Sequence, residues 1–478
     1  MSTPGELITN RVFDELQPGL RASLRRVIRM EDIQAFALVS GDVNPAHVDT
    51  AYADASRFRG VIAHGMFAGA LISSLLGTEF PGPGTIYIGQ SLHFHRPVRL
   101  GDALDVEVVV MDCDAETHNV RLDCTVKNQH GELVVSGEAL VRAPTSKLAL
   151  PRVSLPELHL FDPQARLLHW LASLQLRQAL RCAVVHPCDE ESLKGALDAG
   201  KHGLIVPVLV GPAGRIRATA AQAGLSLEGL ELHDCAHSHA AAEVATAMAA
   251  AGDVAMLMKG SLHTDELISA VLAEPRLRTG RRLSHVFRFE VPSYAKPLLV
   301  TDAAINIRPS LEDKADIARN AIELAHALGV AQPRVALLAA VETVTPRLSS
   351  TLDAAALCKM ADRGQIRGAV LDGPLAFDNA ISSEAAEIKG IQSKVAGQAD
   401  ILLVPDLESG NMLAKQLEYL AGASSCGVVL GAKVPIALTS RADKALSRVA
   451  SAALAWLMAE AGSQPAAGSE AGRQAQHR

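Results

Sequence analysis

The chain has 478 residues, a net charge of −7 and a composition that is 49% hydrophobic and only 3% aromatic. An acidic balance with few aromatic rings argues against a nucleic-acid-binding protein, which needs a basic surface and stacking side chains. The sequence has no apolar run of ~18 residues and no basic-then-apolar start. We therefore expect neither a membrane span nor a signal peptide, and a cytoplasmic location.

Segment 40–49 brings an acidic and an imidazole side chain, Asp42 and His47, into one turn. Gly41 permits a tight bend, and Pro45 keeps the residue before it out of the α region. A carboxylate and an imidazole this close can hold one water between them, one accepting its proton while the other supplies one. The segment is therefore a candidate acid–base site.

One apolar helix and a series of strands follow this segment. Residues 65–76 predict a helix whose first free N–H groups can face an oxygen that becomes negative during a reaction. Period-two alternation and turn residues predict strands at 85–95, 103–112, 120–127 and 132–141. This order predicts an α+β domain in which an antiparallel sheet wraps around the helix.

A proline-rich segment separates this region from a second region with a different sequence pattern. Pro144, Pro151, Pro156 and Pro163 punctuate it without sustained periodicity, which is typical of a linker. We therefore predict four parts, which are a first domain at 1–143, a linker at 144–164, a second domain at 165–461 and a disordered tail at 462–478.

The second domain alternates short apolar strands with helices. Strands are predicted at 182–186, 204–210, 254–258, 298–300, 335–340, 369–371, 401–404 and 427–430. Such alternation predicts a mostly parallel sheet covered by helices on both faces, with ligands beyond the carboxyl ends of the strands. Seven cysteines without a C-x-x-C pair favour buried thiols over a disulfide or zinc framework. The Cys235-x-His237-x-His239 triplet leads into an Ala-rich helix and is interpreted as structural.

The first domain resembles the MaoC-like hydratases. The motifs are Ser-Gly-Asp-x-Asn-Pro-x-His-x-Asp at 40–49, then Ala-His-Gly-Met and Arg-Pro-Val-x-x-Gly-Asp further on. The resemblance implies a hot-dog fold and hydration of trans-2-enoyl-CoA to the (R)-3-hydroxyacyl product. It also implies that Asp42 and His47 form the catalytic pair, that the N–H of Gly65 receives the thioester oxygen, and that Asn44 braces the substrate-binding loop.

The competing interpretation is that Asp42 caps a helix and His47 packs in a core. It suits a lone Asp or a lone His better than this ordered set of residues. His64, His93 and His95 are interpreted as structural residues.

The second domain resembles the phosphate acetyl/butyryltransferases, which interconvert acyl-CoA plus phosphate with acyl phosphate plus CoA. The matching segments are 259–264, 301–306, 372–378, 405–411 and 439–441. The resemblance implies two α/β subdomains with the active site in the cleft between them. By that resemblance Ser440 and Arg441 orient the acyl group and bind anionic charge. Residues predicted to bind substrate are His263, Thr264, Asn306, Asp372 and Asn411.

The match has gaps. Where the family has a catalytic Asp after the Ser-Arg pair, this sequence has Ser447. The catalytic base therefore stays open between Asp443 and Asp378. A family Arg falls near Ile268, and the cluster Arg276–Arg282 either replaces it in binding phosphate or is a solvated basic loop.

The sequence therefore predicts a bifunctional enzyme whose substrates are CoA thioesters and phosphate. It predicts no redox cofactor, because Gly-x-Gly-x-x-Gly does not follow a strand, and no metal, because the recognised motifs require none. A homo-oligomer is expected. The alternatives are a second domain that only binds acyl-CoA or oligomerises, and a second domain that is a dehydrogenase.

Overall fold

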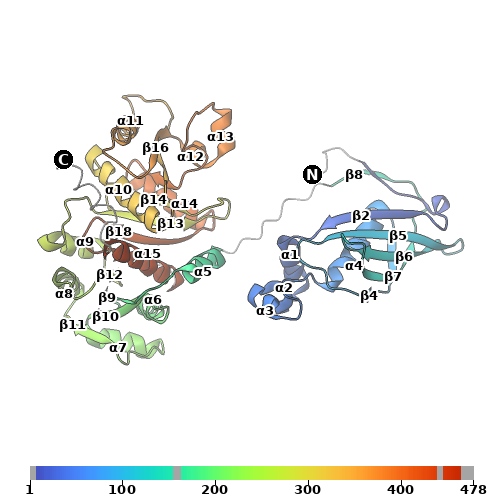
Figure 1. Cartoon of the computed structure of the whole chain (residues 1–478), viewed down its shortest axis with the longest axis horizontal. Helices are drawn as coiled ribbons and strands as arrows, with labels where there is room; N and C mark the ends of the chain where they lie inside the picture. Colours follow the sequence, from blue (N-terminus) through green and yellow to red (C-terminus); the bar gives the residue numbers. More distant parts are fainter. Residues whose placement is uncertain (1–6, 154–162, 439–444, 464–478) are drawn as a thin grey trace, which may run out of the picture. The chain divides into compact units, whose positions relative to one another are not determined.

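A computed structural model describes residues 7–153, 163–438 and 445–463 of the chain. The chain divides into two compact units, residues 1–161 and residues 162–478 (Figure 1). The predicted disordered tail lies outside the described residues from position 464 onward, as does the middle of the predicted linker, 154–162. Within the described ranges, none of the helices combines the length and apolarity needed to cross a bilayer.

The first unit contains one six-stranded antiparallel sheet and a two-stranded ribbon. Its helical segments are η1 (Phe13–Glu15), α1 (Met30–Ser40), α2 (Pro45–Val48), α3 (Thr50–Ala55), α4 (Gly65–Ser74) and the π-helical turn η2 (Leu75–Glu79). Its strands are β1 (Leu7–Thr9), β2 (Arg21–Val27), β3 (Ile86–Gln90), β4 (His93–Phe94), β5 (Ala103–Asp114), β6 (Asn119–Lys127), β7 (Leu133–Arg142) and β8 (Ala149–Pro151).

The large sheet has the order β2-β5-β6-β7-β3, and β4 also pairs with β7. Side chains of β5 and β6 alternate between buried and partly exposed positions, as the period-two pattern predicts. Ala68, Leu71 and Ile72 of α4 share a core with the buried side chains of the sheet. An antiparallel sheet around one apolar helix is the predicted hot-dog architecture, and the prediction is confirmed (Figure 1).

The beginning of the predicted linker is folded. β8 pairs antiparallel with β1, with Ile8 opposite Leu150. The buried amide of Asn10 holds the same segment, because its Nδ2 donates to Ser146 O at 2.8 Å. The prolines therefore do not keep this stretch out of the first unit, since a short two-stranded ribbon at the edge of a fold tolerates them.

The second unit contains an 11-stranded mixed sheet. Its strands are β9 (Leu180–Val185), β10 (Ile205–Gly211), β11 (Glu231–Asp234), β12 (Met256–Lys259), β13 (Ser284–Glu290), β14 (Leu298–Thr301), β15 (Arg334–Leu338), β16 (Val370–Leu375), β17 (Ile401–Leu403), β18 (Ser424–Leu430) and β19 (Ile436–Ala437). Its helices are α5 (Pro163–Ser173), α6 (Glu190–Lys201), α7 (Ala213–Gln222), α8 (Ser238–Ala251), α9 (Thr264–Ala273), η3 (Pro275–Leu277), α10 (Leu311–Ala327), α11 (Ser349–Asp362), α12 (Phe377–Ile381), α13 (Ser383–Ile388), α14 (Leu407–Tyr419) and α15 (Ala445–Ser463).

The strand order is β11-β10-β9-β12-β19-β18-β13-β14-β17-β15-β16. The first five strands form one parallel block and the last four form another. Three antiparallel pairings, β19–β18, β18–β13 and β13–β14, join the blocks. Because three antiparallel pairings lie between them, the strands of one block run in the opposite direction to those of the other. The mostly parallel sheet with two subdomains is confirmed, and the antiparallel pair β13 and β18 forms the join.

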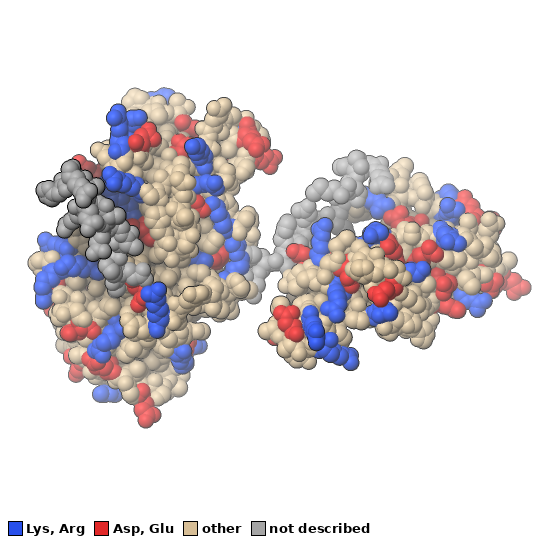
Figure 2. Space-filling model, viewed as in Figure 1, with Lys and Arg blue, Asp and Glu red and all other residues tan. Residues whose placement is uncertain are grey.

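Helices cover both faces of this sheet. α6, α10 and α15 share one core with strand residues such as Val184 and Leu403. The alternate strand residues Val185 and Leu402 pack instead with α8 and α9 and with α12 and α14, on the other face. On the face shown in Figure 2, acidic and basic side chains are intermingled over the first unit, while the second unit also carries runs of basic side chains.

Candidate active sites

The turn that carries Asp42 is fixed by local hydrogen bonds. α1 ends at Ser40 because Gly41 takes a left-handed conformation (φ 73°) and donates its N–H to Ala37 O at 2.9 Å. The Ser40 hydroxyl accepts from the Asp42 N–H at 3.2 Å, and Asp42 Oδ1 accepts from the Asn44 N–H at 3.2 Å. The carboxylate therefore sits on a loop whose backbone is held from both sides.

The short helix α2 positions His47. Asn44 Oδ1 caps the helix by accepting from the Ala46 N–H at 3.1 Å, and Pro45 occupies the first helical position. His47 Nδ1 lies 2.8 Å from Ile62 O. A carbonyl oxygen only accepts, so Nδ1 carries the hydrogen and Nε2 keeps a lone pair. The Asn44 side chain thereby fixes the start of α2, one turn before His47.

His64 links the two predicted catalytic residues. It is only 3% exposed, and its Nε2 lies 2.9 Å from the backbone oxygen of Asp42. Its ring packs on the ring of His47, with centroids 3.9 Å apart. One donor atom from each of Asp42, His47 and His64 lies within 4.8 Å of the other two. His64 thus lies in the same cluster as the predicted pair, and the sequence signal for this placement is its position directly before Gly65.

Gly65 begins α4 directly after His64. The first N–H groups of a helix have no intrahelical acceptor, so they remain available to a ligand oxygen. A Cβ on Gly65 would lie 3.1 Å from Cε1 of Phe94, so the absence of a side chain lets that ring approach. His95 lies outside this group, because its Nε2 bonds the Ser136 hydroxyl at 2.8 Å.

The predicted transferase residues fall into two groups. The first follows β12, where His263 precedes α9 and Thr264 is its first residue. β19 runs parallel to β12 as its neighbour and leads toward Ser440, Arg441 and Asp443. Those three predicted catalytic residues lie outside the described residues.

The second group follows the strands of the other parallel block. Asn411 of α14 donates from Nδ2 to Ala303 O at 3.2 Å, which ties segment 405–411 to segment 301–306. The buried Asn306 bonds within the fold, because its Oδ1 accepts from Arg282 Nε at 2.7 Å. Asp372 lies on the edge strand β16, three positions from β14 in the sheet.

Asp378 is an ion-paired carboxylate on α12. Lys389 Nζ lies 2.9 Å from Asp378 Oδ2 and donates to Glu342 Oε1 at 2.8 Å. The hydrogen bond from Lys389 lowers the pKa of Asp378, and the same lysine together with Asn379 lowers the pKa of Glu342 to about 2. A carboxylate with a lowered pKa is a weaker base, so the geometry disfavours Asp378 as the catalytic base.

The basic cluster Arg276–Arg282 is bonded within the fold. Arg276 pairs with Glu274 at 3.0 Å, Arg278 donates to Leu272 O, Arg281 pairs with Glu323 at 2.6 Å, and Arg282 lies 3.6 Å from an Asp313 oxygen. These contacts favour a structural role over phosphate binding for the cluster.

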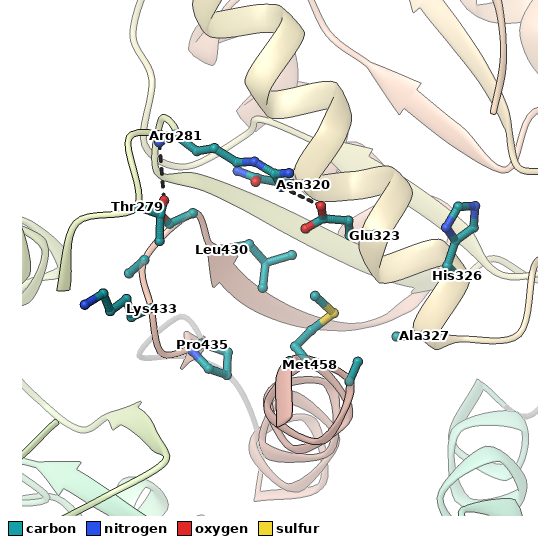
Figure 3. A pocket seen from close by; sticks show the side chains of 14 residues that line it. Thr279, Arg281, Asn320, Glu323, His326, Ala327, Leu430, Lys433, Pro435 and Met458 are labelled. Carbon is teal, nitrogen blue, oxygen red and sulfur yellow. Dashed lines mark hydrogen bonds and ion pairs between the residues drawn. The ribbon is translucent and has the colours of Figure 1, made fainter. Parts of the chain in front are cut away.

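A cavity of about 740 Å³ lies beside this cluster, between α10, α15 and the end of β18 (Figure 3). Arg281 and Glu323 pair on one side of it, and Leu430, Pro435 and Met458 supply apolar surface. Among the described residues, Arg281 is the member of the candidate phosphate-binding cluster that lines this cavity, and His263, Thr264, Asn306, Asp372, Asp378 and Asn411 do not line it. Asn306 lines an adjoining cavity of about 500 Å³, which also contains Ile268.

Comparisons with known proteins assign both regions. The profile of the MaoC like domain matches residues 14–131, and that of the phosphate acetyl/butaryl transferases matches residues 236–456. The class defined by fold and sequence is thus a MaoC-like hot-dog domain joined to a phosphate acyltransferase. The chain belongs to the phosphate acetyl/butyryltransferase family and carries a MaoC-like domain ahead of it.

The chain is similar to several individual proteins. The phosphate acetyltransferase of Rhizobium meliloti is 60% identical over 277 residues, which are 58% of this chain and 88% of that protein. A branched-chain phosphotransacylase from Enterococcus faecalis V583 is 30% identical, with a TM-score of 0.52 over 59% of this chain and 99% of that one. The R-hydratase PhaJ1 from Pseudomonas aeruginosa is 46% identical over 33% of this chain and 100% of that one, with a TM-score of 0.32.

Proposed function

We propose that the chain is a bifunctional enzyme acting on CoA thioesters. Its first unit adds water to a trans-2-enoyl-CoA to give a 3-hydroxyacyl-CoA, and its second unit transfers an acyl group between CoA and phosphate. The observation that carries the first activity is the convergence of Asp42 and His47 beside the N-terminus of α4. Sequence similarity to phosphate acetyltransferases supports the second.

Hydration needs an attacking water, a proton for C2 and stabilisation of the thioester oxygen. As the water oxygen bonds C3, the electrons of the C2–C3 double bond move toward the thioester, and C2 takes a proton. His47 Nε2 carries a lone pair and Asp42 is a carboxylate, so the pair can take the proton of water and deliver one to C2. The N–H of Gly65 is placed to donate to the oxygen that becomes negative.

Acyl transfer needs charge neutralisation and positioning rather than an acyl-enzyme. CoA thiolate or phosphate attacks the acyl carbon directly, while an Arg fork neutralises phosphate charge. With Asp378 held by Lys389, we favour Asp443 as the base. Acyl-CoA and phosphate enter as substrates, no resident cofactor is proposed, and we propose a homo-oligomer.

Two substitutions test both activities in the full chain. Asp42→Asn should lower crotonyl-CoA hydration more than about 100-fold, because the carboxylate is lost, and leave phosphorolysis of acetyl- or butyryl-CoA intact. Arg441→Ala should lower phosphorolysis about 100-fold or more and leave hydration intact. Asp54→Asn, at an exposed carboxylate of α3, is the matched control for the first variant.

The outcomes separate the alternatives. Full hydration by Asp42→Asn would end the case for the first activity. If the wild-type chain releases no CoA from acyl-CoA in the presence of phosphate, the second unit is instead a non-catalytic binding or oligomerising module.

A further inference from the structure

Asp42, His47 and His64 each offer one potential metal-ligand atom, and these three atoms all lie within 4.8 Å of one another. In a tetrahedral zinc site with bonds of about 2.0–2.1 Å, neighbouring ligand atoms lie about 3.4 Å apart. Because 4.8 Å is the upper limit of these separations, each pair of ligand atoms needs to approach by at most about 1.4 Å. Asp42 is exposed on a loop, so its side chain can supply most of that movement by giving up the 3.2 Å hydrogen bond from the Asn44 N–H.

Backbone carbonyls set which nitrogen of each ring is available. His47 donates from Nδ1 to Ile62 O, and His64 donates from Nε2 to Asp42 O. The lone pairs are therefore on His47 Nε2 and His64 Nδ1. Metal-binding histidines characteristically donate their other ring N–H to a backbone carbonyl or carboxylate, as both rings do here.

The unpaired Nδ1 of His64 provides a second, independent argument for a bound ligand. The His64 side chain belongs to a residue that is only 3% exposed, and its Nδ1 has no hydrogen-bond partner among the described residues. A buried acceptor without a donor is unfavourable, because its interaction with water is lost and not replaced. A cation bound by this nitrogen would supply the missing partner.

We propose that Asp42, His47 and His64 bind one divalent transition-metal ion of the Zn²⁺ type, and that the bound ion suppresses hydration. Two imidazoles and one carboxylate suit Zn²⁺ or Co²⁺, whereas Mg²⁺ and Ca²⁺ prefer oxygen ligands. The ion would occupy the lone pair of His47 and the carboxylate of Asp42. Neither group could then exchange protons with substrate or water.

The binding step stands independently, while the inhibition rests on the proposed hydratase function. The test uses the full chain, stripped of metal with a chelator and titrated with Co²⁺. We expect one Co²⁺ per first unit, with the visible absorption of a nitrogen- and oxygen-ligated ion and no thiolate charge-transfer band. Zn²⁺ should displace it and inhibit crotonyl-CoA hydration, and chelation should restore the rate.

Variants locate the site. Asp42→Asn and His64→Gln should each weaken Co²⁺ binding more than about tenfold. His95→Gln should leave it unchanged, because that ring bonds Ser136 outside the trio. The calorimetric transition of the first unit in the same samples reports whether each variant is folded, and Asp42→Asn alters only an exposed side chain.

Equal Co²⁺ affinity in wild type, Asp42→Asn and His64→Gln would overturn the proposal, as would full hydration activity with Zn²⁺ bound. A chain that binds Co²⁺ through the trio but hydrates no enoyl-CoA, even after chelation, would overturn the proposed function and leave the metal site supported.

Discussion

Single residues of the predicted transferase site differ in how their polar groups are used. Asn306 is only 2% exposed, and its Oδ1 accepts from Arg282. Its Nδ2 donates to Leu283 O at 2.7 Å and to Asp302 Oδ2 at 2.5 Å. An amide with every strong contact inside the protein has little left for a substrate, so we expect Asn306 to act by ordering the loop at 301–306.

Replacing this amide tests that role. Asn306→Ala should lower the unfolding free energy of the second unit by about 2–3 kcal/mol, because buried donors and acceptors lose their partner. Asn411→Ala should cost less than about 1 kcal/mol, since that residue is exposed and makes one bond at 3.2 Å. Denaturant unfolding of both variants provides the comparison. A stable Asn306→Ala protein with a raised KM would instead support the predicted substrate contact.

Single site residues could be predicted from the sequence where their contacts are with sequence neighbours, and not where they depend on tertiary contacts. Asp42 and His47 were predictable because a few neighbouring residues define their turn. The stacking of His64 on His47 and the pairing of Asp378 with Lys389 depend on tertiary packing. Residue identity alone does not specify such contacts.

At the scale of elements, alternation and apolar runs predicted most strands of both sheets, but not β13. This strand carries Arg288 and Glu290, whose charges suggest a surface segment. In the fold they pair with each other at 2.6 Å and are almost fully buried. The pairing with β14, the next strand in the chain, is local, but the pairing of Arg288 and Glu290 with β18 joins segments far apart in the sequence, so a local pattern could not reveal their burial.

One glycine decides how β7 meets its neighbours. β3 and β4 both pair with β7, and the chain between them passes directly over Gly137. A Cβ at Gly137 would lie 1.9 Å from Ser91 O, so the two segments must separate if a side chain is added. Glycine in a strand interior often marks such a close approach of another backbone.

Gly137→Ala should therefore destabilise the first unit by more than about 2 kcal/mol, through strain that neither backbone can relieve easily. Gly89→Ala is the matched control in the same sheet, since a Cβ there meets nothing within 4 Å. Thermal unfolding followed through loss of hydration activity measures both. Equal midpoints for the two variants would show that the segment carrying Ser91 moves aside without cost.

For the whole molecule, the important feature is that no core cluster of the described residues mixes the two units. The first unit has one cluster, which includes Leu122 of β6. The clusters of the second unit lie within residues 167–456 and include Leu402 of β17. Separate cores predict separate cooperative transitions, so a single free energy of unfolding does not describe this protein.

Two buried leucines allow this independence to be measured. Leu122 and Leu402 are both completely buried in strands, and truncating either to alanine should cost about 3 kcal/mol through lost transfer energy and a cavity. Leu122→Ala should lower the temperature at which hydration is lost and leave that of phosphorolysis unchanged. Leu402→Ala should do the reverse. Calorimetry of the full chain should show one transition moving in each variant while the other stays fixed. If both transitions shift together in either variant, the two units are coupled energetically, and the separation of their cores does not extend to their stability.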